Sequence, residues 1–510
     1  MSTFPVEAEA SDGNFATETA RRAARNAAAL AFANVVTKGA LFAWQIVLAR
    51  LLGAAEYGVY GTIGALLAIG AAIPEFGMGL LVLRDVARRP QDAARYLGAT
   101  LTLQPLLAAL GYVVLLGAAW LLGYSMELRA LLALAAVSLL VDALGNMCHN
   151  QLLAQERMVI PSLIAVGHVA ALLTLGGAAL LLGWGLWGLY AATIAAGLGR
   201  AAVYWAALGR TGVRPTLPAD RALMRALLRD GWPIALNAFL FLAYQHTDKL
   251  LTTAVLGAEG TGQLMAGFVI VFGVIELLST TVLVAVFPMM SRMWGEGQRR
   301  LFQVLMEKLA FFNLLFSVPI AIFTSLLAVP LSALLFGAGF TKTASVLEVL
   351  IWYTVVTMVN NVFAQALLIQ NRQRRLLMIR ASGLALNVAL LLALLPLLDV
   401  QGAAVATLLA ELMIMVTLVR SFIFPADWWA RVRNHLWRLA WVALATAAAV
   451  WALRGVHPLL AATVGVPLYL VLVLSSGALA ADDWDLLYRM TTAMPGGAWV
   501  RRWWRREMTA

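Results

Sequence analysis

The chain has 510 residues, of which 62% are hydrophobic and 12% are charged, and its mean hydropathy is +0.84. A soluble domain is closer to half apolar and a quarter charged, so the composition excludes a soluble globular protein and indicates a polytopic membrane protein. The single cysteine, Cys148, excludes an internal disulfide and a cysteine metal cluster. The net charge of +11 would suit a nucleic-acid partner, but its distribution along the chain points to a membrane instead.

The N-terminal segment is polar and acidic, whereas a signal peptide would begin basic and continue apolar. We therefore expect residues 1–20 to form a disordered cytoplasmic tail and the first span to act as an uncleaved signal anchor. Fourteen apolar segments follow, each long enough to cross a bilayer. The predicted spans lie near 27–49, 58–83, 97–122, 130–154, 159–182, 185–208, 231–254, 262–289, 304–328, 344–369, 377–397, 401–423, 436–453 and 458–480.

The Lys and Arg residues fall mostly in the segments on one side of the predicted membrane topology. With the N-terminus in the cytoplasm, thirty of the 37 fall in cytoplasmic segments and five in outer segments. The remaining two, Lys38 and Arg200, lie within spans. So large a bias is a strong positive-inside signal, and it predicts that both termini are cytoplasmic.

The predicted fold class is all-α integral membrane, with 14 transmembrane helices. Two parallel six-helix lobes are predicted, because each repeat has an even number of spans, and duplicated bundles of this kind form two lobes around a central cavity in many transporters. The arginines and leucines of 219–229 fall on different helical faces, so we expect this part of the linker to lie on the membrane surface. The predicted segments are the N-lobe 21–208, a cytoplasmic amphipathic linker 209–230, the C-lobe 231–425, two further spans in 426–480, and a basic, Trp-rich cytoplasmic tail 481–510.

Two short segments occur twice, in the same order. LGAAEYG at 52–58 returns as LGAEGTG at 256–262, and LLAQER at 152–157 returns as LLIQNR at 367–372. Two repeated segments in the same order suggest that a membrane module has been duplicated. The charge distribution places both LGA segments on the periplasmic side, where we expect tight outer turns at the mouth of the cavity.

Ionisable and amide side chains inside spans are functional candidates, because their burial in a bilayer is costly. Asn34, Lys38 and Gln45, with Thr37, follow the spacing of one face of the first span. That face would line a hydrated cavity, with Lys38 meeting an anionic substrate group. A lysine that snorkels or pairs with a neighbouring helix is the alternative.

Three carboxylates are candidates for ion coupling. Glu75 follows Pro74 in the second span, and Glu276 lies 201 residues later at a near-equivalent place in the eighth. Asp248 closes the seventh span beside Lys249. All three would bind a coupling cation or a proton. For Glu75 and Glu276, pairing with Lys38 or a structural hydrogen bond between packed helices is the alternative.

Polar faces recur at matching places in the fourth and tenth spans. Both are candidates for lining a substrate cavity, with interhelical hydrogen bonds as the alternative. The residues concerned are Asp142, Asn146 and His149 in the fourth span, and Asn360, Asn361 and Gln365 in the tenth.

No catalytic signature appears in the chain. The sequence has no Walker motif, no HExxH and no GxSxG. We therefore expect a protein that is not an enzyme and that uses no cofactor and no metal.

Three motifs carry a family resemblance. RLLGAAEYGVY at 50–60 resembles the end of the first span of polysaccharide-biosynthesis flippases. DKLL at 248–251, with the glycines that follow, and FPMMSR at 287–292 are similar to the ends of their seventh and eighth spans. These flippases belong to the multidrug/oligosaccharidyl-lipid/polysaccharide exporter superfamily, and the resemblance covers roughly residues 20–425.

The resemblance implies alternating access by two six-helix lobes in the bacterial inner membrane. It implies that the cargo is an undecaprenyl-pyrophosphate-linked oligosaccharide repeat unit, used for exopolysaccharide or O-antigen assembly, and that Lys38 meets the pyrophosphate. Membrane lipids, a polysaccharide polymerase and a chain-length regulator would be partners of a monomeric protein that binds no nucleic acid. Lipid II flippases, cation-coupled multidrug exporters and, from another class, a membrane polymerase or ligase are the alternatives.

Overall fold

The computed structural model describes residues 7–424, 428–455 and 457–477, and every regular element in these ranges is helical. The predicted tail 481–510 lies outside the described residues. The helices are α1 (Glu7–Gly70), α2 (Ala72–Glu75), α3 (Met78–Arg88), α4 (Ala93–Leu121), α5 (Met126–Ala135), α6 (Val137–Ala154), α7 (Val159–Leu181), α8 (Gly185–Gly209), α9 (Arg221–Ile275), α10 (Thr281–Gly295), α11 (Arg299–Leu326), α12 (Ala328–Phe336), α13 (Thr343–Ile369), α14 (Gln373–Val419), α15 (Trp428–Arg454) and α16 (Pro458–Ser475), with a 3-10 turn η1 (Pro90–Asp92) and a π turn η2 (Glu276–Thr280).

Ten helical segments in the described ranges are long and apolar enough to cross a membrane, and Leu460–Ser475 is a shorter apolar helix. The chain is therefore a multi-pass membrane protein. Three of its long helices are kinked in mid-length, α1 at Gly53, α9 at Gly257 and α14 at Asp399. Each kink is a residue with non-helical backbone angles that falls between two predicted spans, so α1, α9 and α14 each consist of two helices that meet at the kink. The count of fourteen spans stays a prediction.

The first helix begins inside the segment that the sequence predicts to be disordered. α1 starts at Glu7, and residues 7–20 are its first turns. This part of the chain is rich in Ala and Glu, which favour helix, and it is continuous with an apolar span that supplies the helical nucleus.

The helices form two compact units, each described by itself. Unit 1 comprises residues 1–269, 335–341 and 380–403, and unit 2 comprises residues 270–334, 342–379 and 404–510. The units thus divide α9 and α14, whereas the predicted lobes divide the chain at the linker 209–230. Contacts of the first part of α9 with α1, α3 and α4, given below, explain why it belongs to unit 1.

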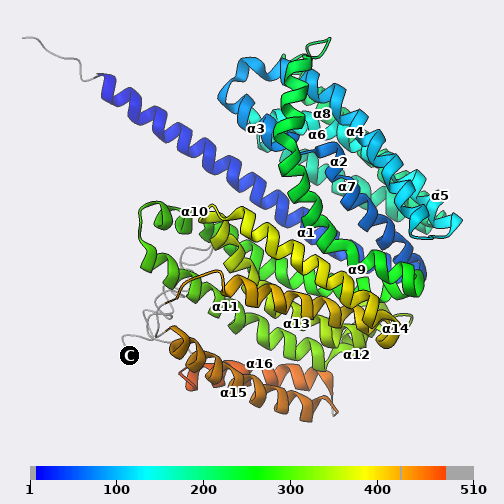
Figure 1. Cartoon of the computed structure of the whole chain (residues 1–510), viewed down its shortest axis with the longest axis vertical. Coiled ribbons are helices and arrows are strands. Elements are labelled where there is room, and N and C mark those ends of the chain that lie inside the picture. Colours follow the sequence, from blue (N-terminus) through cyan, green and yellow to red (C-terminus); the bar gives the residue numbers. More distant parts are fainter. Residues whose placement is uncertain (1–6, 425–427, 456, 478–510) are drawn as a thin grey trace, which may run out of the picture. The chain divides into compact units, whose positions relative to one another are not determined.

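In unit 1 the helices α4, α6, α7 and α8 pack side by side, and α3 lies against α6 (Figure 1). Leu223 and Leu227, on the first turns of α9, are buried in a cluster with Met78, Leu81 and Ala99. The leucine face of the predicted linker helix therefore packs on protein, while Arg225 on its other face is exposed.

The start of α9 is fixed by Asp220. The Oδ1 atom of Asp220 accepts hydrogen bonds from the backbone N–H groups of Ala222 (2.8 Å) and Leu223 (3.2 Å), which caps the helix. Its Oδ2 atom accepts a bond of 2.7 Å from Nε of Arg95 on α4. The guanidinium of Arg95 holds the pKa of the Asp220 carboxyl below its usual value.

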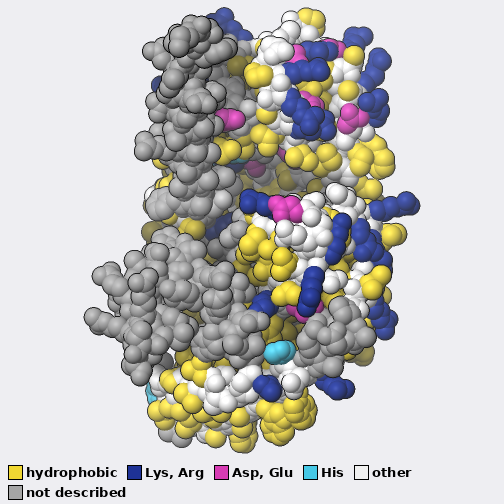
Figure 2. Space-filling model, turned by 90° about the vertical axis from the view of Figure 1, so that its left-hand side faces the viewer, with side chains coloured by type: hydrophobic (Ala, Val, Ile, Leu, Met, Phe, Trp, Pro, Cys, Tyr) yellow, Lys and Arg dark blue, Asp and Glu magenta, His cyan; other side chains and the backbone are white. Residues whose placement is uncertain are grey.

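In unit 2, α11 packs on α13 and on α15, and α15 pairs with α16. Tyr469 on α16 donates a hydrogen bond of 2.7 Å to the carbonyl of Leu315 on α11. Apolar side chains dominate the visible face of α15 and α16 at the foot of Figure 2, and Trp437, Trp441 and Trp451 are among those exposed. Such a surface suits contact with lipid and its interface.

Residues near span ends that the predicted topology places on one side of the membrane contact one another. On the predicted outer side, Arg50 donates to the carbonyl of Leu335 (2.7 Å) and Gln263 to that of Gly339 (3.0 Å). On the predicted cytoplasmic side, Arg372 donates to the carbonyl of Ser421 (2.9 Å). The contacts agree with the order of crossings, and which side is cytoplasmic stays a prediction.

Both repeated segments adopt the same local geometry in their two copies. Glu156 (φ 59°) and Asn371 (φ 57°) are left-handed residues that end α6 and α13. The N–H groups of Arg157 and Arg372 then bond back to the carbonyls of Leu152 (3.1 Å) and Leu367 (2.9 Å). This double bonding at a left-handed residue is a Schellman-type helix end. A duplicated sequence has therefore kept a duplicated backbone turn.

Candidate functional site

Glu75 lies at a break between α1 and α3. The short helix α2 ends there because Phe76 (φ 40°) and Gly77 (φ 72°) both take left-handed conformations. Oε1 of Glu75 accepts a hydrogen bond of 2.9 Å from the N–H of Gly79, in the first turn of α3. A carboxylate at a helix N-terminus is stabilised by the unpaired N–H groups and by the helix dipole. Glu75 is therefore held in a fixed position within the predicted second span.

Gly79 leaves the space that Glu75 occupies. A Cβ at Gly79 would overlap Oε1 of Glu75 and would lie 2.8 Å from the Asn150 amide nitrogen. Any side chain at this position would displace one of these two groups.

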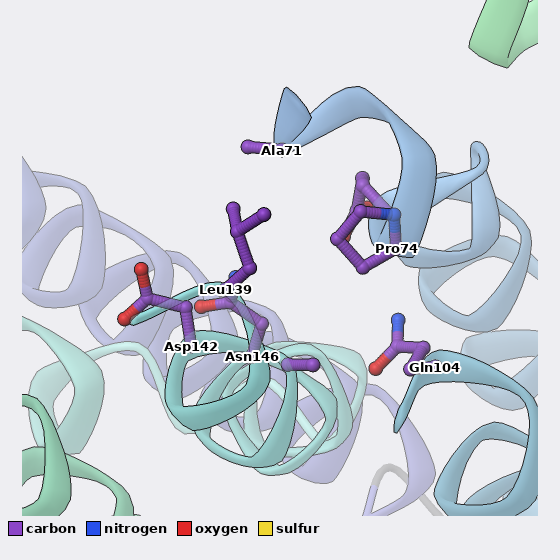
Figure 3. Close-up of a pocket in the computed structure, with 8 residues that line it drawn as sticks. Ala71, Pro74, Gln104, Leu139, Asp142 and Asn146 are labelled. Carbon is purple, nitrogen blue, oxygen red and sulfur yellow. The ribbon is translucent and has the colours of Figure 1, made fainter. Parts of the chain in front are cut away.

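Glu75 borders a cavity of about 60 Å³ that is enclosed by α2, α4 and α6. This volume is large enough for a few water molecules or a small ion. Figure 3 shows Asp142 and Asn146 on α6 and Gln104 on α4 around the same space as Pro74. The lining residues are Ala71, Pro74, Glu75, Gln104, Leu139, Asp142, Ala143 and Asn146.

Gln104 is the most deeply buried polar residue of this lining. It is 2% exposed, and its Oε1 atom accepts no hydrogen bond from the described residues. A buried amide oxygen without a donor costs roughly 1–3 kcal/mol. This acceptor is therefore available to a group that enters the cavity.

Asp142 connects the cavity to α8 through an ion pair. Its Oδ1 atom lies 2.7 Å from the Nη2 atom of Arg200, and the side chains of Arg200 and Asp142 are 19% and 45% exposed. The side chain of Asp142 thus both lines the cavity and pairs with α8. The sequence identified Asp142 but gave Arg200 little weight. The position of Arg200 in the middle of an apolar segment could have identified it as a candidate site residue. Its partner, Asp142, is known only from the packing of α6 against α8.

The other polar residue predicted on this face of α6 is engaged elsewhere. Nδ1 of His149 lies 2.9 Å from the hydroxyl of Tyr204, and the two rings meet edge to face. His149 therefore packs between α6 and α8, whereas Asp142 and Asn146 line the cavity.

The two LGA segments, named here the first corner (52–58) and the second corner (256–262), meet in unit 1. Gly53 (φ 71°, ψ 173°) and Gly257 (φ 81°, ψ 179°) make the same kink in α1 and α9. Gly58 and Gly262 then face each other across the contact. A Cβ at Gly58 would overlap the carbonyl of Ala258, and a Cβ at Gly262 would overlap that of Ala54. Equivalent residues therefore make reciprocal contacts, as at a two-fold interface.

A chain of hydroxyl groups extends from this contact into unit 1. The Thr62 and Thr253 hydroxyls lie 2.5 Å apart, those of Thr253 and Thr261 lie 2.6 Å apart, and Thr261 donates to the Lys249 carbonyl at 3.3 Å. The hydroxyl of Tyr124, in the loop after α4, donates to the Leu250 carbonyl at 2.9 Å, and burial raises the pKa of this phenol. The corners thus close on buried polar contacts, of which the Thr62–Thr253 bond joins α1 to α9 and the Tyr124–Leu250 bond joins the loop after α4 to α9.

Asp248 and Lys249 form a buried pair beside this network. The side chains are 5% and 7% exposed, and Nζ of Lys249 lies 3.3 Å from Oδ1 of Asp248 and 3.0 Å from the carbonyl oxygen of Gln245. Nζ also lies 4.6 Å from the centre of the Phe268 ring. Asp248 therefore has a cationic partner in the same helix. Its role in ion coupling stays a prediction.

The predicted face of the first span divides into two parts. Asn34 and Lys38 are exposed on α1, as a residue that meets a substrate must be. Gln45 instead accepts a hydrogen bond of 3.0 Å from Tyr57 and donates one of 3.4 Å to Tyr60. Gln45 therefore helps to hold the first corner.

The predicted site residues of unit 2 are placed differently. Glu276 begins the π turn η2, so both Glu75 and Glu276 lie where helical geometry is interrupted. Asn360 is 3% exposed and donates hydrogen bonds of 3.1 and 2.9 Å to the carbonyl and Oε1 of Glu411. Asn361 and Gln365 are half-buried on α13. Asn360 therefore joins α13 to α14. No group of three His, Cys, Asp or Glu side chains suited to a metal ion occurs among the described residues.

Comparisons with known proteins agree with this architecture. A family described as "Polysaccharide biosynthesis protein" matches residues 47–345, which is more than half of the chain. No curated protein matches.

Three solved structures share the fold. A structure described as "Lipid II flippase MurJ, inward closed conformation" has a TM-score of 0.71 at 12% identity, covering 88% of this chain and 97% of its own. An inward-facing multidrug resistance MATE family transporter has a TM-score of 0.62 at 16% identity, with 78% and 94% covered. A point mutant of the Vibrio cholerae MATE transporter VcmN has a TM-score of 0.54 at 16% identity, with 79% and 98% covered. The first of these is described as a flippase and the other two as transporters.

The match over residues 47–345 and the shared fold lead to one assignment. The chain belongs to the polysaccharide biosynthesis protein family, with a fold of the multidrug/oligosaccharidyl-lipid/polysaccharide exporter superfamily.

Proposed function

We propose that the chain is a flippase for undecaprenyl-pyrophosphate-linked oligosaccharide repeat units in the bacterial inner membrane, serving exopolysaccharide or O-antigen assembly. The family match over residues 47–345 carries this proposal, because that family is described by polysaccharide biosynthesis. The fold supports it, since a lipid II flippase has the same arrangement of helices over 88% of the chain.

The mechanism that we propose is alternating access. The sugar would cross a wet cavity while the lipid tail stays in the bilayer, and the two parts of the protein would rock to open it on either side. Lys38 is exposed on α1, and its ammonium could form a charge-assisted contact with the pyrophosphate. The energy would come from an ion gradient or the membrane potential.

The contact between the two corners would close the predicted periplasmic side. Gly58 and Gly262 bring the backbones of α1 and α9 together without intervening side chains. Release of cargo on that side would require this contact to separate. Separation would also break the Thr62–Thr253 hydrogen bond between α1 and α9.

Deletion of the gene followed by extraction of lipids tests the cargo. We expect undecaprenyl-linked oligosaccharide to accumulate on the cytoplasmic leaflet, with loss of the surface polymer. Normal arrival of repeat units in the periplasm, in a strain without a second flippase, would refute the proposal. In the proposed pathway, a polymerase and a chain-length regulator act on the lipid after it has been flipped. Co-purification of the chain with either protein would test that partnership.

The fold match also supports a second candidate, a lipid II flippase. The same deletion distinguishes the two, because loss of lipid II export would stop peptidoglycan synthesis and lyse the cells. Growth without lysis, together with loss of the surface polymer, favours the repeat-unit cargo. A third candidate, a multidrug exporter, follows from the MATE matches and predicts that deletion sensitises cells to cationic drugs.

A further inference from the structure

The segment that precedes α9 is fastened to α3 and α4 within unit 1. The N–H of Thr216 donates a hydrogen bond of 3.1 Å to the carbonyl of Ala94, and a Cβ at Gly98 would lie 2.2 Å from the Thr216 carbonyl oxygen. Val213 packs against the buried cluster that contains Val86 of α3. The segment therefore has a defined path over the end of α3 and the start of α4, at the upper end of unit 1 in Figure 1.

This path leaves a group of arginines exposed at one end of unit 1. Residues 84–95 and 210–230 together contain nine arginines and four aspartates, which gives a net charge of +5. Three of these arginines are paired with aspartates, and the pairs are Arg84–Asp85, Arg95–Asp220 and Arg229–Asp230. The other six are exposed and form no ion pair with the described residues, and Figure 2 shows Lys and Arg side chains gathered around this end. These six, named here the basic surface, are Arg88, Arg89, Arg210, Arg214, Arg221 and Arg225.

The charges of the basic surface do not stabilise the helix that carries two of them. Arg221 is the first residue of α9, Arg225 lies about one turn further, and the first turn contains no acidic residue. A cation at a helix N-terminus opposes the helix dipole, and like charges four residues apart repel each other. The opposite face of the helix is already covered, because Leu223 and Leu227 are buried in protein. An anionic partner on the arginine face would offset both unfavourable interactions.

The basic surface lies where membrane-crossing segments end. Segments long and apolar enough to cross a membrane end at Arg88 and Gly209, and others begin at Pro90 and Arg221. Four of the six arginines are therefore at, or next to, the end of such a segment, which is the depth of lipid headgroups. A guanidinium group matches a phosphate in charge and can donate two parallel hydrogen bonds to it.

We propose that the basic surface binds the phosphate groups of anionic phospholipids in the adjacent leaflet. In the predicted topology this is the cytoplasmic leaflet, whose anionic lipids attract basic segments beside membrane spans. A soluble acidic protein would have to displace the headgroups that already lie at this depth. Lipids bound here would hold the start of α9 at the membrane surface. The proposal does not depend on which cargo the protein moves.

The test uses the purified full-length chain in detergent, titrated with dioleoylphosphatidylglycerol or with zwitterionic dioleoylphosphatidylcholine. Native mass spectrometry gives the affinity for each lipid. Arg221→Gln/Arg225→Gln removes two charges of the basic surface. Arg292→Gln/Arg300→Gln is the matched control, because it removes two exposed arginines from the ends of α10 and α11, on either side of Glu296.

We expect the wild type to bind phosphatidylglycerol at least about tenfold more tightly than phosphatidylcholine. An arginine near an anionic membrane surface contributes about fivefold to affinity, so Arg221→Gln/Arg225→Gln should bind phosphatidylglycerol about 25-fold more weakly. The control variant should stay within about twofold of wild type. Without added lipid, Arg221→Gln/Arg225→Gln should melt at or above the wild-type temperature, because the helix N-terminus then carries less positive charge.

Equal affinity of the wild type for the two lipids would overturn the proposal. Equal losses in the two double variants would overturn it as well, since net charge alone would then account for binding. Displacement of phosphatidylglycerol by millimolar inorganic phosphate would identify a soluble phosphate ligand instead of a lipid. If Arg221→Gln/Arg225→Gln does not elute as a monodisperse protein, Arg88→Gln/Arg214→Gln removes two other charges of the basic surface and should cause the same loss.

Discussion

Alanine at Gly58 should weaken the contact between the two corners. A Cβ at this position would overlap the carbonyl of Ala258 and lie 2.8 Å from the backbone nitrogen of Gly262, against 3.4 Å for an ordinary contact. Because the Ala258 oxygen would lie only 1.7 Å from this Cβ, half the ordinary contact distance, the two backbones must move apart to admit it. Neither neighbour is a flexible side chain, so the strain cannot be relieved by a rotamer change.

The size of the effect follows from this strain. Overpacking of a well-packed contact costs about 1–3 kcal/mol. If the corners are together in one state and apart in another, that cost shifts the equilibrium about 5- to 150-fold toward the separated state. Export of the lipid-linked oligosaccharide should fall, because the closed state that alternating access requires is then less populated.

A buried hydroxyl beside the contact can report its opening. Thr253 is 8% exposed, and we would replace it by cysteine in a Cys148→Ala background, so that it is the sole thiol. Labelling by a membrane-impermeant maleimide from outside should become about 5- to 150-fold faster when Gly58→Ala is added, in proportion to that shift. Gly64→Ala is the matched control, because Gly64 also lies on α1 and a Cβ there meets nothing within 4 Å.

Equal labelling rates in the Gly58→Ala and Gly64→Ala proteins would refute this reasoning. If Gly58→Ala fails to accumulate, Gly262→Ala provides the reciprocal perturbation, since its Cβ would overlap the carbonyl of Ala54. An effect at one glycine and none at the other would also contradict a reciprocal contact.

Three further substitutions test the site residues. Lys38→Ala should reduce export severalfold without loss of folded protein, with Lys38→Arg retaining it; unchanged export of Lys38→Ala, measured by lipid accumulation, would remove Lys38 from the mechanism. Arg200→Gln should lower the free energy of unfolding by about 1–2 kcal/mol. The loss is smaller than for a fully buried ion pair because the Asp142 side chain is 45% exposed. In thermal melting, the double variant with Asp142→Asn should recover part of this loss. Asn360→Ala should cost about 1–3 kcal/mol, since it leaves buried acceptors of Glu411 without that donor, and a melting temperature equal to wild type would contradict the interhelical role of Asn360.

The sequence determined the fold class and the outline of the helices. An apolar composition with short polar breaks allows only membrane-spanning helices, because backbone groups in lipid must bond within their own segment. The repeats at 52–58 and 256–262 predicted a duplication, and both copies have the same glycine kink. Periodicity within α6 also identified Asp142 and Asn146, which share a face of one helix and both line the cavity.

Only the tertiary structure decided which polar residues meet. Helical spacing places His149 on the same face as Asp142, but it cannot show that Tyr204 of α8 engages the histidine while Arg200 pairs with the aspartate. It cannot show that Gln104 completes the cavity from α4, since a single glutamine in an apolar span carries no periodic signal. Periodicity records which side chains share a surface of one helix, whereas a site is made where surfaces of several helices converge.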